Sequence, residues 1–259
     1  MSVLKLQKGI IYGPILSRRL GRSLGINLLP LDKKLCSYNC IYCQYGYTGL
    51  LTTNPDSSLF PSVDEVVGAI ERALKRPHTL DHVTFSGNGE PTLHPDFNQI
   101  VRETIKLRDR FKPQAKTAVL SNASLITKPE IVEAYNLLDK PILKLDSGSK
   151  ETFQDVNNPV KGVDLEEILA GMRIVRGLVV QTALFAGELS NSSPEKIEEL
   201  INILRIVKPI EMQLYSTERP VADGRVIKLN ASELELIAAQ IQSETGLSVK
   251  AFSVDGPTQ

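Results

Sequence analysis

Residues 35–46 read LCSYNCIYCQYG and contain all three cysteines of this 259-residue chain, Cys36, Cys40 and Cys43. The spacing is C-x3-C-x2-C, so that one compact loop can turn three thiols toward a common centre. An odd number of closely spaced cysteines makes a poor disulfide framework, whereas clustered thiols more often bind metal or carry out redox chemistry. The segment therefore predicts a metal or redox centre.

Three thiolates leave the kind of centre open. A tetrahedral zinc site needs a fourth ligand, and the histidines lie outside the loop, at His78, His82 and His94. An iron–sulfur cube held by three thiolates leaves one iron without a protein ligand, where a substrate or cofactor can bind. A third interpretation treats the cysteines as small buried apolar residues. That interpretation is disfavoured because no cysteine occurs elsewhere in the chain.

Outward from the loop, apolar runs of strand length alternate with amphipathic runs of helix length. The predicted strands are residues 25–29, 83–86, 117–120, 142–145, 178–185 and 212–214. The predicted helices are residues 95–111, 128–138, 164–175, 194–207 and 231–244. This alternation predicts a parallel sheet with right-handed crossovers. Roughly six units are fewer than the eight of a closed barrel, so we predict an α/β fold, a partial (β/α)6 TIM-like barrel. A flat doubly wound sheet fits the same order of elements.

The remaining parts of the chain are predicted as short extensions of this barrel. Residues 10–16 and 23–29 are expected to form an N-terminal β-hairpin, and a helix is expected near the C-terminus. We predict one domain over residues 1–259, with an extension at 1–24, the barrel at 25–215 and an extension at 216–259.

Composition narrows the class of protein. Apolar residues make up 42% and charged residues 23% of the chain, which is typical of a globular domain. The formal net charge is zero, whereas a protein that coats polyanions is usually basic. No stretch approaches the roughly 18 apolar residues of a spanning helix, and the first 20 or so residues lack the features of a signal peptide. We expect a cytoplasmic protein without a membrane segment.

The cysteine motif, with Tyr42 as the aromatic residue of C-x3-C-x-aromatic-C, resembles the cluster loop of the radical S-adenosylmethionine (SAM) enzymes. In that family the loop follows the first strand of a partial (β/α)6 barrel, and here it follows residues 25–30. The resemblance extends over most of residues 13–219. It implies that Cys36, Cys40 and Cys43 hold one [4Fe–4S] cluster, with SAM bound at the open iron.

A second segment, FSGNGEPTL at residues 85–93, resembles the Gly-Gly-Glu motif whose backbone binds the methionyl amino group of SAM. The corresponding residues are Gly87, Asn88, Gly89 and Glu90, with Asn88 where the first glycine is usual. Glycine suits this role because a ligand can approach the main chain only where no side chain blocks it.

Other SAM contacts are implied at the ends of later strands. Ser121, Asn122 and Asp146 resemble the residues that contact the ribose, and Gly187 resembles a position near the adenine. Tyr42 is also assigned to the SAM site. Polar residues at such places also serve as helix caps or turn residues, so that both interpretations stay open. No catalytic residue is assigned.

The resemblance also implies a reaction. In this family a reduced cluster passes an electron to the sulfonium of SAM, which yields methionine and a 5′-deoxyadenosyl radical that removes hydrogen from a substrate. A low-potential donor, flavodoxin or ferredoxin, is the implied partner. Residues 13–25 and 213–220 are similar to the wyosine-synthase-like radical SAM proteins of bacteria and archaea, which makes a tRNA base the candidate substrate. The wyosine synthases proper carry further cysteines, which this chain lacks.

A cluster of arginines precedes the barrel. Arg18, Arg19 and Arg22 are candidates for binding a substrate phosphate or carboxylate, or else belong to a solvated hairpin. Two alternatives to the tRNA reaction stay open. One is a radical SAM enzyme that modifies a peptide or protein, such as a glycyl-radical activase. The other is a non-catalytic three-cysteine zinc-binding domain.

Overall fold

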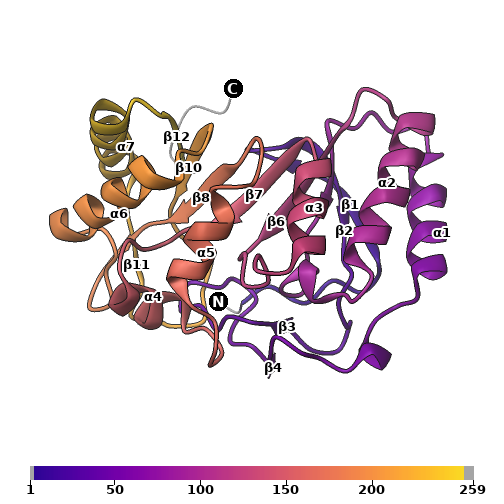
Figure 1. The fold of residues 1–259 in the computed structure, drawn as a ribbon, viewed down its shortest axis with the longest axis horizontal. Coiled ribbons are helices and arrows are strands. Elements are labelled where there is room, and N and C mark those ends of the chain that lie inside the picture. Colours follow the sequence, from indigo (N-terminus) through magenta and orange to yellow (C-terminus); the bar gives the residue numbers. More distant parts are fainter. Residues whose placement is uncertain (1–2, 254–259) are drawn as a thin grey trace.

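The computed structural model describes residues 3–253, and its central feature is an open, curved sheet of eight strands (Figure 1). The strand order is β1-β2-β5-β6-β7-β8-β10-β12. Strand β1 is antiparallel to β2, and each later neighbour in the sheet is parallel to the last. The strands are β1 (Ile11–Ser17), β2 (Gly21–Ile26), β5 (His82–Phe85), β6 (Lys116–Ser121), β7 (Lys140–Lys144), β8 (Val179–Ala183), β10 (Glu211–Tyr215) and β12 (Ser248–Phe252). The predicted partial barrel is confirmed.

The first strand differs in extent from the prediction. Strand β2 is at once the second strand of the predicted hairpin and the first strand of the barrel, and it ends at Ile26. The chain turns immediately afterwards, because Asn27 folds back to donate from Nδ2 to the carbonyl of Leu29 at 3.0 Å. A seventh parallel strand, β12, was not predicted and pairs with β10.

Seven α-helices accompany the strands within the described residues. They are α1 (Val63–Leu74), α2 (Phe97–Phe111), α3 (Pro129–Leu137), α4 (Lys150–Asn157), α5 (Leu165–Met172), α6 (Pro194–Val207) and α7 (Ala231–Thr245). Two of them, α1 and α4, were not predicted. In Figure 1, α1 to α3 lie beside the half of the sheet that contains β2 and β6, and α6 and α7 lie at the end that contains β10 and β12. Between residues 3 and 253 no helix is long and apolar enough to cross a membrane.

Two short strand pairs and two 3-10 turns complete the structure. Strand β3 (Leu35–Cys36) pairs with β4 (Leu50–Leu51), and β9 (Phe185–Ala186) pairs with β11 (Ile227–Lys228). The turns are η1 (Ser57–Leu59) and η2 (Pro91–Leu93). The first pair fixes the start of the cysteine loop.

The two faces of the sheet have different neighbours. Leu143, Val180 and Leu214 belong to the main apolar core. Their neighbours along the strands point to the opposite face, because side chains alternate along a strand. On that face Ile142 and Val179 form a small separate cluster with Leu20, which comes from the turn between β1 and β2. We call this second face the concave face. It carries the polar residues described below.

Candidate SAM and cluster site

The cysteine loop, residues 35–46, lies across the carboxyl ends of β5 and β6. Leu35 donates its backbone N–H to the carbonyl of Asn88 at 3.0 Å, and Glu90 donates its own to the carbonyl of Leu35 at 3.1 Å. Gly89 and Leu35 also form a parallel β-bridge. The cysteine motif and the predicted Gly-Gly-Glu-like segment are therefore in direct contact.

The far side of the loop is held by the end of α4. Asn39 and Ile41 donate backbone hydrogen bonds to the carbonyls of Asn157 and Val156, at 3.0 and 3.1 Å. These bonds are possible because α4 ends at Asn157 and is capped by Asn158, whose left-handed conformation exposes the last carbonyls of the helix. The loop is thus fixed between strand ends on one side and a helix end on the other.

Each cysteine has a nitrogen donor from another part of the chain. Asn122 Nδ2 lies 3.6 Å from Cys36 Sγ, and Asn157 Nδ2 lies 3.5 Å from Cys40 Sγ. The ammonium group of Lys34 hydrogen-bonds to Cys43 and also donates to the carbonyl of Gly46 at 2.9 Å. Asn122, Asn157 and Lys34 are all buried. Such donors stabilise negative charge on sulfur and tune the potential of iron–sulfur centres.

Burial controls the protonation of these thiols. It raises the pKa of Cys36 to about 12 and that of Cys40 to about 11, so both thiols are protonated at neutral pH without a metal. Burial alone lowers the pKa of Lys34, but the three nearby cysteines outweigh it and the net shift is upward. Lys34 is therefore a buried positive charge next to three potential thiolates. A bound metal centre deprotonates such thiols outright.

The donor set fits a multi-iron cluster. Among residues 3–253, no three His, Cys, Asp or Glu side chains converge closely enough to hold a single ion. The zinc interpretation also lacks its fourth ligand, because His82 Nδ1 bonds the carbonyl of Leu20 at 2.7 Å and His94 Nε2 bonds that of Pro61 at 2.9 Å. Three thiols that share one loop without meeting at one point suit a cube in which each thiolate binds a different iron.

The two glycines of the Gly-Gly-Glu-like segment are sterically required. Gly87 and Gly89 have φ values of +143° and +144°, a region that disfavours side chains. A Cβ on Gly89 would lie 1.7 Å from the carbonyl oxygen of Leu35, and one on Gly87 would lie 2.4 Å from Asn27 Oδ1. Gly89 therefore packs main chain directly against the cysteine loop, and Gly87 packs main chain against the side chain of Asn27.

Asn88 and Glu90 serve the framework. Asn88 accepts from the backbone N–H of Gln7 at 2.7 Å and donates to the carbonyl of Pro30 at 2.8 Å, which explains an amide where a glycine is usual. Glu90 is buried, which raises the pKa of its carboxyl. Its oxygens accept from Thr92, from Ser121 Oγ at 2.7 Å and from the backbone N–H of Asn122 at 2.6 Å. Glu90 therefore ties the end of β5 to the end of β6.

The residues assigned to the ribose are placed differently from one another. Ser121 Oγ is buried and lies 2.7 Å from Tyr135 Oη of α3, so it faces the helices. Asn122 faces the cysteine loop and donates to Ser37 Oγ at 2.9 Å. Asp146 is buried at the end of β7, beside the loop. The structure brings Asn122 and Asp146 next to the cysteine loop, whereas Ser121 contacts Glu90 and Tyr135.

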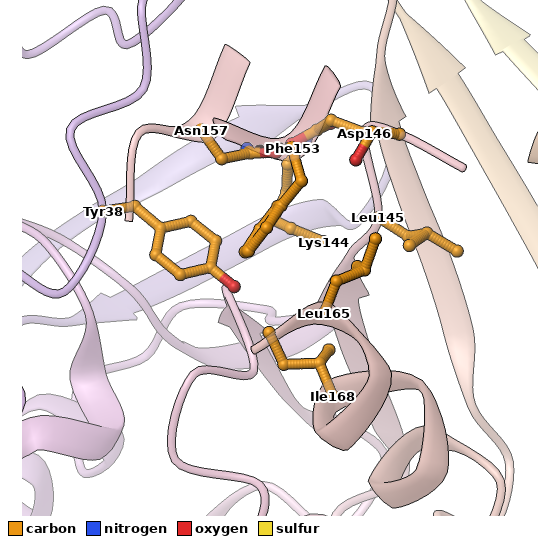
Figure 2. Close-up of a pocket in the computed structure, with 9 residues that line it drawn as sticks. Tyr38, Lys144, Leu145, Asp146, Phe153, Asn157, Leu165 and Ile168 are labelled. Atoms are coloured by element: carbon orange, nitrogen blue, oxygen red, sulfur yellow. Dashed lines mark hydrogen bonds and ion pairs between the residues drawn. The ribbon is translucent and has the colours of Figure 1, made fainter. Parts of the chain in front are cut away.

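Asp146 is the centre of a hydrogen-bonded network. Its Oδ1 accepts from the N–H of Ala183 at 2.8 Å and from Lys144 Nζ at 2.9 Å. Its Oδ2 accepts from Tyr42 Oη and from Asn157 Nδ2, the latter at 2.8 Å. Figure 2 shows Asn157, Asp146 and Lys144 around a small pocket that Tyr38 and Phe153 also line. The aromatic residue of the cysteine motif is thereby locked to the end of β7.

Lys144 and Asn157 were not identified as site residues from the sequence. Lys144 is the last residue of β7, and its place two residues before Asp146 on the same face was the available signal. Lys144 Nζ lies 3.0 Å from Tyr215 Oη and 5.1 Å from the centre of the Tyr42 ring. Asn157 lies on a helix that was not predicted, so no local pattern connected it with the loop.

The other predicted site residues, which are Gly187 and the three arginines, have different surroundings. Gly187 follows β9, and a Cβ there would lie 2.5 Å from the carbonyl of Arg225. Arg22 is exposed and bound to Asp81, with Nη2 and Oδ1 3.1 Å apart. Arg18 ion-pairs with Glu218. Arg19 alone of the three lies against the concave face, with Cζ 4.7 Å from the centre of the Tyr215 ring.

Comparison with known proteins gives a family and several relatives. The family model described as "Radical SAM superfamily" matches residues 34–204. A UPF0026 protein of Synechocystis is 34% identical over 218 residues, which are 81% of this chain and 76% of that protein. A UPF0026 protein of Methanocaldococcus jannaschii is 32% identical over 223 residues, 83% of this chain and 65% of that protein. A protein of Brachyspira hyodysenteriae named GTPase Obg is 31% identical, but this chain spans only 36% of its length.

Solved structures share the fold at low sequence identity. A radical SAM methyltransferase from Sphaerobacter thermophilus superposes with a TM-score of 0.66 at 16% identity, over 90% of this chain and 67% of that one. TYW1 with a lysine–pyruvate adduct bound gives 0.62 at 17% identity, over 90% and 77%. SuiB of Streptococcus suis bound to S-adenosylmethionine gives 0.63 at 16% identity, over 89% and 49%.

Proposed function

Because the chain belongs to the radical SAM superfamily, we propose that it is an enzyme that binds one [4Fe–4S] cluster at Cys36, Cys40 and Cys43 and cleaves SAM reductively. Membership implies catalysis of the radical SAM type. When bound, the cluster supplies an electron and SAM supplies the 5′-deoxyadenosyl group that takes hydrogen from a substrate. The observation that carries the proposal is that each of the three cysteine sulfurs has a buried N–H donor from another part of the chain.

The chain's own residues hold this chemistry in place. Asn122, Asn157 and Lys34 stabilise negative charge on the thiolates and so favour the bound cluster. Gly87 and Gly89 let the main chain of residues 87–90 pass close to the cysteine loop, and this main chain is proposed to bind the methionyl end of SAM. Asp146 fixes the position of Tyr42 and, with Asn122, is proposed to stand near the ribose. Gly187 is proposed to lie near the adenine.

Anaerobic reconstitution with iron and sulfide tests the cluster. We expect about four irons per chain and 5′-deoxyadenosine on reduction with SAM present. Cys36→Ala, Cys40→Ala and Cys43→Ala should each abolish deoxyadenosine formation, because loss of one thiolate removes an iron or its geometry. Tyr47→Phe is the matched control, since Tyr47 directly follows the cysteine loop, is half exposed and donates from its hydroxyl to Asp223. Full cluster absorbance in a triple cysteine variant would sink the proposal.

The substrate proposal is a tRNA base, with a peptide or protein as the alternative, and flavodoxin or ferredoxin as the electron donor. The tRNA proposal rests on the resemblance of residues 13–25 and 213–220 to the wyosine-synthase-like branch. Incubating the reduced holoprotein separately with tRNA, peptide and small-molecule pools distinguishes these classes. Stimulation of deoxyadenosine formation by the tRNA pool alone supports the first, and stimulation by peptides alone replaces it with the second.

A further inference from the structure

The concave face of the sheet is polar where β7, β8 and β10 end. Gln181 of β8 and Gln213 of β10 are buried and joined by an amide hydrogen bond of 3.2 Å. Beside them stand Lys144 and Tyr215, whose side chains are partly exposed. This surface adjoins the cluster loop through Tyr42, because Lys144 lies near that ring and shares Asp146 with it. A molecule here would be next to the SAM site.

Two cations flank one aromatic ring on this surface. Lys144 Nζ lies 4.6 Å and Arg19 Cζ lies 4.7 Å from the centre of the Tyr215 ring. Lys144 lies at the carboxyl end of β7 in the middle of the sheet, and Arg19 belongs to the turn that precedes the amino end of β2. The hairpin is held across the open side of the sheet by the ion pair between Arg18 and Glu218, just beyond β10.

The two cations differ in their partners. Lys144 is neutralised by Asp146, whose oxygens are fully used by Lys144, Tyr42, Asn157 and the backbone of Ala183. In the part of the chain described, the guanidinium of Arg19 has an aromatic partner but neither a hydrogen bond nor an ion pair. Half-burial without a polar partner is costly for a charged group.

The charges that face Arg19 leave one positive charge unmatched. Glu218 lies near enough to act on the pKa of Arg19 but is ion-paired with Arg18. At the start of β10, Glu211 is paired with Lys140 and Lys250 and contributes no spare negative charge. At the Tyr215 ring, Arg18, Arg19 and Lys144 against Glu218 and Asp146 sum to a single positive charge, whereas Lys140, Lys250 and Glu211 add one more at the opposite end of β10. The single positive charge at the ring matches a monoanion better than a phosphate dianion, which Glu218 would repel more strongly.

We infer that Arg19, with Lys144 and Tyr215 beside it, binds a carboxylate group of the substrate on the concave face. A nucleobase carries no carboxylate, so the inference belongs to the peptide or protein alternative. The inference rests on the proposed function, because it takes the substrate to lie next to the SAM site. A guanidinium presents a planar fork that matches a carboxylate with two parallel hydrogen bonds. The ammonium of Lys144 and the hydroxyl of Tyr215, 3.0 Å apart, are further donors at the same ring.

The test measures binding of a simple carboxylate to the reconstituted holoprotein with and without SAM. Acetate labelled with ¹³C is the probe, and its line broadening in NMR spectra reports binding; acetamide and inorganic phosphate are compared. Arg19→Gln should weaken acetate binding about tenfold or more, the usual effect of losing a charged hydrogen-bond partner. Arg19→Lys should restore part of it. The matched control is Arg205→Gln, which removes an exposed arginine of α6 that pairs with Glu244.

Several results would overturn the inference. They are absence of acetate binding to the wild type, equal binding by Arg19→Gln, and binding of phosphate in place of acetate. Loss of acetate binding on addition of SAM would assign Arg19 to the carboxylate of SAM itself. If circular dichroism shows that Arg19→Gln is unfolded, Arg19→Lys decides, since acetate affinity equal to wild type would then contradict the inference. Deoxyadenosine formation without substrate, measured in parallel, tests the proposed function separately.

Discussion

Asn157 is the residue at which α4, the cysteine loop and the end of β7 meet. One side-chain amide nitrogen lies 3.5 Å from Cys40 Sγ and 2.8 Å from Asp146 Oδ2, and its residue's carbonyl accepts from Asn39. A hydrogen bond to a thiolate favours the more negative, reduced state of a cluster. Asn157 is therefore expected to act on the redox potential as well as on the shape of the loop.

Asn157→Leu should lower the midpoint potential of the cluster, by on the order of tens of millivolts, because the N–H donor to Cys40 is lost. A redox titration followed by EPR measures this shift. Asn158→Gly is the control, since Asn158 is exposed at the same helix end and glycine keeps its left-handed conformation. Equal potentials in Asn157→Leu and wild type would remove Asn157 from this role.

Gly89→Ala should destabilise the protein and hinder cluster loading. The new Cβ would meet the carbonyl of Leu35 at 1.7 Å, which adds a clash to backbone strain of about 1–3 kcal/mol. Gly162→Ala separates the two effects, because Gly162 has φ +96° but no atom within 4 Å of the new Cβ. Urea unfolding should show a clearly larger loss for Gly89→Ala. Equal losses would mean that the loop yields to the methyl group at little cost.

At the scale of elements, local signals predicted some helices and missed others. Ser193 caps α6 with Pro194 in its first turn, and Asn230 caps α7, which gives two of the predicted helices a local start signal. Helix α1 was missed although Ser62 and Glu65 form a capping box at its start. Strand β12 follows α7 directly and has partly exposed residues, so only its pairing with β10 defines it.

From the sequence, the site could be predicted only where a short motif contains the residues that carry the chemistry. The cysteine spacing identified the cluster loop, and the glycines at 87 and 89 identified the segment beside it. Both signals are local, because clustered cysteines and glycines can be recognised within a few residues. The hydrogen-bond donors to the sulfurs could not be identified in this way. Asn122 lies 86 residues and Asn157 lies 117 residues from the cysteine that each contacts. Their role depends on how strand ends and a helix end come together.

Asp139 joins three elements at the amino ends of the strands. Its Oδ2 accepts from Arg108 Nη1 of α2 at 2.7 Å and from the N–H and hydroxyl of Thr117 in β6, and the next residue begins β7. Burial raises the pKa of Asp139, but the bonds from Thr117 and Arg108 outweigh it and the net shift is downward. Ionised Asp139 therefore stabilises the fold above its unfolded pKa, and this contribution is lost as pH falls through the lower folded value.

Asp139→Asn should lower the free energy of unfolding at pH 7 by about 1 kcal/mol, a value that allows for the solvent exposure of the carboxylate. The difference from wild type should shrink below about pH 4 as the wild-type carboxyl is protonated. Urea unfolding at both pH values measures it. Asp109→Asn, which removes an exposed partner of the same arginine, should change stability little. A loss for Asp139→Asn that is equally large at pH 7 and pH 3 would contradict the electrostatic explanation.

At the scale of the whole molecule, the cysteine loop connects parts of the chain that are distant in sequence. It contacts the ends of β5 and β6 and the end of α4. A ligand that binds only the folded form raises stability by mass action. That the chain forms one domain over its whole length stays a prediction.

Reconstitution should therefore raise the thermal midpoint and slow hydrogen exchange in residues 35–46, with a smaller effect in β6 and β7. Both changes should disappear in Cys40→Ala, which keeps the fold but lacks one thiolate. Differential scanning calorimetry and exchange mass spectrometry under anaerobic conditions measure them. An unchanged midpoint on loading would show that the site is already fully ordered without its cluster.

The hairpin of β1 and β2 contributes two side chains, Arg19 and Tyr12, to the concave face. The ring of Tyr12 lies over Gly25, where a Cβ would come within 2.1 Å of it, and its hydroxyl bonds Ser86. The loop and strand ends proposed to handle SAM come from other stretches of the chain. If Arg19 binds the substrate as proposed, variation confined to this hairpin is expected to change substrate choice more than SAM cleavage.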